Sequence, residues 1–218
     1  MKKFSIISLI ILSVVLGGQI CHAGAIDVDW SPFEFGIFTP VQIFDEDSNI
    51  CFLRISAFYT KNKAAYGFDF GVINNSIDAA GLQISLANIC QDSQMGLGIG
   101  VINFARNSAY GCQIGAFNKS GSGKILAEYA SGAGVQIGWA NISKSLFSGV
   151  QIGVANISTA AFSGLQLGFV NSDRDHNSFD KVLGYKDKTD HKKDTCVQIG
   201  FLNFNEDGFL PIFPIINF

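Results

Sequence analysis

The stretch Gly134-Val-Gln-Ile-Gly-Trp-Ala-Asn-Ile-Ser-Lys-Ser-Leu-Phe-Ser148 is followed at once by a second copy, Gly149-Val-Gln-Ile-Gly-Val-Ala-Asn-Ile-Ser-Thr-Ala-Ala-Phe-Ser163. A third copy begins with Gly164-Leu-Gln-Leu-Gly-Phe169. A unit of 15 residues is too short to bury an apolar face by itself, so neighbouring units must stack on one another. The sequence therefore predicts a repeat protein.

The same phrase, Gly-x-Gln-x-Gly-x-x-Asn, recurs along most of the chain. Nine units begin at Phe52, Gly67, Gly81, Gly96, Gly111, Gly134, Gly149, Gly164 and Cys196. The third position carries Gln83, Gln113, Gln136, Gln151, Gln166 and Gln198, with Arg54, Asp69 and Gly98 in the other units. The eighth position carries Asn74, Asn88, Asn103, Asn118, Asn141, Asn156, Asn171 and Asn203, with Tyr59 in the first unit. We predict that these amides stack about 4.8 Å apart as hydrogen-bonded structural ladders.

The alternation of apolar and small or polar residues indicates strands, and the frequent glycines disfavour helices. We therefore predict an all-β fold, a parallel β-solenoid with coils of about 15 residues. Apolar residues also recur five apart, as in Ile152, Ile157 and Phe162. This spacing predicts an apolar interior, in which Ile152→Asp unfolds the stack.

An antiparallel outer-membrane β-barrel, acting as a pore or anchor, is the alternative. Val150, Ile152 and Val154 would then face lipid, and Trp139, Phe169 and Phe201 would share an aromatic girdle. Three features favour the solenoid. Adjacent units are near copies of each other along their whole length. In an antiparallel barrel, the corresponding ends of adjacent strands would lie on opposite sides of the membrane and would be expected to differ. The long insertions follow the fifth and eighth units, on opposite sides of such a barrel. Prolines 211 and 214 interrupt a closing strand.

The phrases Trp139-Ala-Asn-Ile-Ser143 and Val154-Ala-Asn-Ile-Ser158 resemble pentapeptide-repeat units at a distance. The whole phrase from Gly149 to Asn156 is more similar to an uncharacterised surface-repeat family of exported bacterial proteins, first noted in leptospires. The resemblance implies a repeated architecture and an exported location, and it implies no particular activity.

The ends of the chain differ from the repeats. Residues 1–23, with Lys2, Lys3 and a short apolar run, predict a cleaved signal peptide; Ile20 before Cys21 disfavours lipoprotein processing. We expect an N-terminal capping segment at 24–51, a repeat domain at 52–205 with insertions at 119–133 and 172–195, and a C-terminal capping segment at 206–218. The expected location is the periplasm, outer membrane or cell surface.

Charge is distributed unevenly. Residues 81–171 contain only six charged side chains, Asp92, Arg106, Lys119, Lys124, Glu128 and Lys144, whereas half of the 24 residues at 172–195 are charged. The second insertion is therefore predicted to be solvated. The formal net charge of −3 and the lack of a basic patch argue against nucleic acid as a partner. A protein or surface partner, or association with the outer membrane, is expected instead.

No residue pattern predicts catalysis or metal binding. The chain lacks a Gly-x-Ser-x-Gly elbow, and its repeats supply no histidine. The spacing Asp173-x-Asp175-x-Asn177 imitates the start of a calcium loop, but Gly184 stands where that loop needs its acidic twelfth residue. We expect a non-enzymatic protein without cofactor or metal. Cys51, Cys90, Cys112 and Cys196 remain after cleavage, and their disulfide state is left open.

Overall fold

The computed structural model describes residues 29–121, 131–173, 195–205 and 209–218. The predicted signal peptide, most of the two insertions and residues 206–208 lie outside these ranges. The described strands are β1 (Trp30–Phe38), β2 (Val41–Gln42), β3 (Asn49–Ile84), β4 (Ala87–Cys90), β5 (Ser93–Ile99), β6 (Ile102–Ala105), β7 (Ser108–Ile114), β8 (Phe117–Ser120), β9 (Ser131–Ser143), β10 (Leu146–Ser158), β11 (Phe162–Asp173), β12 (Cys196–Asn205) and β13 (Ile212–Asn217). The described residues contain no helix, so the prediction of an all-β chain is confirmed.

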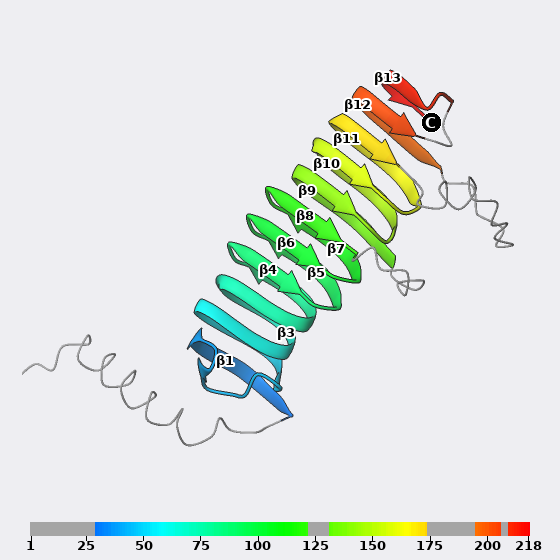
Figure 1. Ribbon diagram of the computed structural model, residues 1–218. Helices are drawn as coiled ribbons and strands as arrows, with labels where there is room; N and C mark the ends of the chain where they lie inside the picture. Colours follow the sequence, from blue (N-terminus) through cyan, green and yellow to red (C-terminus); the bar gives the residue numbers. More distant parts are fainter. Residues whose placement is uncertain (1–28, 122–130, 174–194, 206–208) are drawn as a thin grey trace, which may run out of the picture.

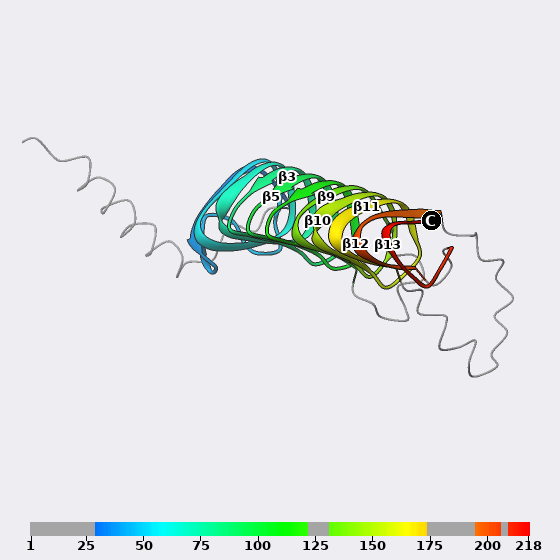
Figure 2. The same ribbon diagram turned by 90° about the horizontal axis from the view of Figure 1, so that it is seen from above.

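Successive units pair in parallel and in register. Gly149 of β10 pairs with Gly134 of β9 and with Gly164 of β11, and the glutamines and asparagines of these units pair in the same way. Figure 1 shows the units rising one above another from β3 to β12, and Figure 2 shows the same stack from above. The sheet is largely parallel, whereas the barrel alternative expects antiparallel neighbours. Within the described ranges, antiparallel pairs occur at the two ends, between β1 and β2 and between β12 and β13.

The interior of the stack is mostly polar, with an apolar corner at Phe147 and Phe162, so the prediction of an apolar interior is wrong for most of its length. Gln151 and Asn156 are fully buried, whereas Ile152 is 39 % exposed. Because neighbouring residues of a strand point to opposite faces, an inward glutamine forces the isoleucine beside it outward. Of the three apolar residues spaced five apart, Phe162 is buried and Ile157 is half-buried. Ile152→Asp therefore places its charge at the surface and is no longer expected to unfold the stack.

Each unit turns a corner between its third and eighth positions. A Cβ on Gly153, two residues after Gln151, would meet the Gly138 carbonyl oxygen and the Asn141 side chain, so this position also faces inward. Asn156 and Ser158 face inward on the next short run. Inward positions are thus separated by two residues, Val154 and Ala155, instead of one. The alternation of inward and outward side chains is therefore shifted by one residue at this point, and the chain bends there.

The first position of seven units holds a glycine with positive φ: Gly67, Gly81, Gly96, Gly111, Gly134, Gly149 and Gly164. At Gly149, φ is 148°, and a Cβ would collide with the Gly134 carbonyl oxygen. Residues other than glycine rarely adopt this backbone conformation. The glycine column therefore lets the backbones of adjacent units approach one another.

Candidate functional site

A glutamine ladder runs along the interior. The Gln151 Nε2 donates to Gln136 Oε1 at 2.7 Å, and the Gln151 Oε1 accepts from Gln166 Nε2 at 2.8 Å. The same pattern reaches Gln198 at one end, whose Nε2 donates to Gln166 Oε1 at 2.9 Å. The structure thus connects all six glutamines that the repeat singles out, with one residue added between Gln83 and Gln113. The ladder consists of Gln83, Gln94, Gln113, Gln136, Gln151, Gln166 and Gln198.

Gln94 is the residue that sequence reasoning missed. The unit that begins at Gly96 has Gly98 at the third position, and Gln94 lies four residues earlier, at the end of the preceding unit, where it pairs with Ala79 and Ala109. Its side chain reaches across the interior, where its Nε2 donates to Gln83 Oε1 at 3.0 Å and its Oε1 accepts from Gln113 Nε2 at 2.6 Å. A Cβ on Gly98 would collide with this Gln94 amide. The available signal was that one glutamine is missing at position 98 while another stands only four residues earlier, at position 94.

A paired substitution tests this replacement. Gln94→Ala leaves Gln83 Oε1 and Gln113 Nε2 without their partner, so we expect it to cost about 2–4 kcal/mol of unfolding free energy. The double variant Gln94→Ala/Gly98→Gln returns glutamine to the third position and is expected to regain most of this loss. Urea unfolding followed by circular dichroism measures both. A double variant no more stable than Gln94→Ala would contradict the replacement.

An asparagine ladder runs beside the glutamines. Asn141 Nδ2 donates to Asn156 Oδ1 at 2.8 Å and also to the carbonyl oxygen of Ile152 at 2.9 Å. Each asparagine from Asn88 to Asn171 makes this pair of bonds to the following unit. The structure joins all eight predicted asparagines, Asn74, Asn88, Asn103, Asn118, Asn141, Asn156, Asn171 and Asn203. The second bond fixes the carbonyl that precedes each corner.

The two ladders have opposite polarity. Every glutamine amide donates toward the N-terminal end of the stack, whereas the asparagines donate to one another toward the C-terminal end. Each ladder consequently ends on an acceptor that has no hydrogen bond among the described residues, Gln198 Oε1 at one end and Asn74 Oδ1 at the other. Antiparallel rows of amide dipoles partly cancel, which reduces the electrostatic cost of aligning them in a low-dielectric interior.

Charged residues take the place of glutamine where the ladder begins. The Asp69 carboxylate accepts Arg54 Nε at 2.8 Å and Arg54 Nη2 at 2.6 Å, and Gln83 Nε2 donates to it at 3.2 Å. Arg54 is fully buried, and its Nη1 donates to the carbonyl oxygen of Asn75 at 2.8 Å. The carboxylate thus receives the donor end of the glutamine ladder. A positive dipole end pointing at a negative charge is favourable.

Glu34 of β1 extends this inner row beyond Arg54, with which it is paired in register. Its two carboxylate oxygens accept the backbone N–H groups of Ile43 and Phe44, each at 2.9 Å. Burial raises the pKa of Glu34, although these hydrogen bonds and the Arg54 charge oppose the rise. Glu34 therefore holds the segment after β2 across the N-terminal end of the described stack.

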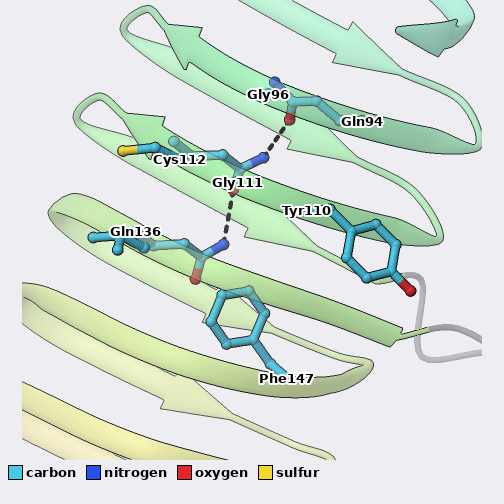
Figure 3. A pocket seen from close by; sticks show the side chains of 10 residues that line it. Gln94, Gly96, Tyr110, Gly111, Cys112, Gln136 and Phe147 are labelled. Atoms are coloured by element: carbon cyan, nitrogen blue, oxygen red, sulfur yellow. Dashed lines mark hydrogen bonds between the residues drawn. The ribbon is translucent and has the colours of Figure 1, made fainter. Parts of the chain in front are cut away.

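A small cavity lies inside the stack beside the glutamine ladder. Its lining includes Gln94, Ala109, Gln136 and Phe147, and its volume is about 10 Å³, close to the minimum for one water molecule. Figure 3 shows the Gln94 and Gln136 amides in one hydrogen-bonded row, with the Phe147 ring beside Gln136. The cavity arises where the small residues at one inner corner give way to Phe147 and Phe162, whose rings stack at 5.8 Å. It has no room for an organic substrate.

The cysteines and acidic residues of the described chain form no reactive cluster. Within the described ranges, no three His, Cys, Asp or Glu side chains are placed to hold a metal ion. Cys51, Cys90 and Cys112 are free thiols, and burial raises the pKa of Cys90 to about 12. Cys112 is half-buried, not buried as a core residue would be. Most of the acidic and histidine residues of the second insertion lie outside the described ranges.

Apolar side chains form two columns on the outside of the stack. The fourth position gives the isoleucine column, with exposed Ile55, Ile84, Ile114, Ile137, Ile152 and Ile199. The sixth position gives the aromatic column, with exposed Leu86, Val101, Trp139, Val154, Phe169 and Phe201. Phe169 and Phe201 stack with ring centroids 4.9 Å apart. Large exposed apolar surfaces mark interaction sites in folded proteins.

Comparison with known protein families, curated proteins and solved structures finds no match to this chain. None of the described residues belongs to a helix long and apolar enough to cross a membrane. The features of the described chain that bear on function are thus the buried amide ladders and the exposed outer columns.

Proposed function

We propose that this chain is a parallel β-solenoid and a non-enzymatic bacterial envelope protein with a structural or interaction role. The observation that carries the proposal is the in-register pairing of identical positions from unit to unit. The parallel direction of these pairs is the reason to prefer this assignment over an antiparallel barrel that acts as a pore or anchor.

The hydrogen bonds among the buried side chains support a structural role. The buried amides of the repeats are engaged by their counterparts in adjacent units, and Arg54 and Asp69 are engaged by each other. Side chains held in this way stabilise a rigid rod, because each unit satisfies the next. Such a rod suits a spacer or platform better than it suits a catalyst, whose groups must be available to a substrate.

The places where the repeats are interrupted support an interaction role. The described ranges end at Gly121 and at Asp173, the eleventh and tenth positions of their units, and resume at Ser131 and Thr195. Both insertions therefore start from the same corner. We propose that they are available to a protein or surface partner, and that the signal peptide predicted at 1–23 directs the chain out of the cytoplasm.

Protease treatment of intact cells tests the proposed location and role. We expect cleavage within the lysine-rich insertion at 172–195 in intact cells, while the repeats stay protected as large fragments. An epitope tag inserted at 122–130 is expected to be accessible to antibody in the same cells, because both insertions start at the same corner of the stack. Cleavage that needs cell lysis would contradict a cell-surface location, and rapid digestion of the repeats would contradict a rigid stack.

A further inference from the structure

We infer that the outer apolar columns form a lipid-binding surface, whose partner is the hydrocarbon region of a membrane; this inference rests on the envelope role proposed above. From Leu86 to Phe201 the fourth and sixth positions contain no charged or polar side chain in any unit. Trp139 is 72 % exposed and Val154 is 58 % exposed. Exposure of such residues along the whole length of a stack is unfavourable in water.

The backbone makes the sides of the stack compatible with hydrocarbon. Ile152 pairs with Ile137 of the unit before it and with Leu167 of the unit after it. Hydrogen bonds therefore run along the stack, and its sides present side chains instead of unpaired N–H and C=O groups. Satisfied backbone groups are the main requirement for contact with lipid tails. The amides of the interior likewise bond to one another along the two ladders, whose terminal acceptors face the ends of the stack and not its sides.

The shape of the apolar surface favours lipid over a second copy of the chain. Ile152 lies before the corner at Val154 and Ala155, while the half-exposed Ile157 follows it, so the apolar surface continues around the bend. A second copy of the stack, which is rigid, would cover the apolar surface on only one side of the bend. Fluid hydrocarbon covers both sides together, since it adapts to a curved surface.

Charged side chains are placed at the other corner. Asp92, Arg106 and Lys144 occupy the eleventh and twelfth positions, close to where both insertions leave. Lys119 is the exception, because it is a half-buried residue at the ninth position with its ammonium over the Phe104 ring at 4.7 Å from the centroid. The face of the Phe104 ring attracts this ammonium and partly compensates its lost hydration. The outer surface is thus divided into an apolar part and a charged corner, as expected for a protein that lies on a membrane.

Vesicle binding tests the inference. The protein is mixed with phosphatidylcholine vesicles and with vesicles that also contain phosphatidylglycerol, and bound protein is separated by flotation at low and high salt. We expect binding to both, with little effect of salt. In a Trp30→Phe variant, whose other tryptophan is Trp139, we expect phosphatidylcholine with brominated acyl chains to quench the fluorescence.

Matched variants locate the contact. Val154→Asp is expected to weaken vesicle binding about tenfold or more, because it places a charge in the apolar column. Thr159→Asp, five residues later at the charged corner, is expected to bind like the wild type. Circular dichroism is expected to show that both variants keep the strand content of the wild type, since both side chains lie outside the interior.

Three outcomes would overturn the inference. The first is no flotation with either vesicle, and the second is flotation with anionic vesicles alone that is lost in high salt. The third is a dimer in sedimentation that Val154→Asp dissociates while vesicles leave Trp139 unquenched, which would assign the columns to a second copy. If one of these outcomes is found and the insertions are nevertheless cleaved by protease in intact cells, the lipid-binding inference is wrong while the proposed envelope role still holds.

Discussion

An Arg54→Leu variant is expected to lose about 3–5 kcal/mol of unfolding free energy, because it leaves the buried Asp69 carboxylate without its cation. Arg54 and Asp69 form a buried ion pair with two hydrogen bonds. The penalty comes mainly from the uncompensated charge, not from the lost attraction. Urea unfolding monitored by circular dichroism measures the loss.

A double variant separates the charge from the position. Arg54→Gln/Asp69→Gln places the common residue of the repeat at both sites, where the two amides extend the glutamine ladder. We expect it to be clearly more stable than Arg54→Leu, although short of the wild type because Asn75 loses a donor from Arg54. Lys61→Met is the control, since it breaks the exposed Lys61–Glu46 pair and is expected to change little. Equal stability of Arg54→Leu and the wild type would contradict the buried pair.

Gly149→Ala is expected to destabilise the stack by about 4 kcal/mol or more. The residue has a φ of 148°, which alanine adopts only with strain. Its added Cβ also meets the carbonyl oxygen and carbon of Gly134, which belong to the backbone of the adjacent unit. A flexible side chain moves aside, whereas a paired backbone cannot move without separating the two units.

The neighbouring Ser148→Ala is the control for this substitution. Ser148 is exposed and adds no contact when its hydroxyl is removed, so we expect stability within about 0.5 kcal/mol of the wild type. Thermal unfolding by circular dichroism compares the two variants. A melting temperature of Gly149→Ala equal to that of Ser148→Ala would show that the units are further apart than the structure places them.

The membership of the two ladders followed from the repeat alone. A polar residue that returns at the same position in unit after unit needs a partner in each, and stacked copies provide one. The glutamines and asparagines singled out on this basis are the ones that the structure joins, with Gln94 as the addition. Gln94 escaped because a one-dimensional alignment compares equal positions, while a long side chain reaches across the interior from another position.

The sequence by itself determined the period of the units, the strand content and the residues that stack on their counterparts. The tertiary structure decided which side of each strand faces inward. An apolar and an amide residue alternate in most units, so either set satisfies the same two-residue period. The structure places the amides inside, where they bond in two ladders of opposite polarity, and it leaves the isoleucine and aromatic columns outside. The physical reason is that an amide between two copies of itself satisfies both its donor and its acceptor in a dry interior, whereas burying an apolar side chain there would leave the amide beside it on the outer face without such a partner.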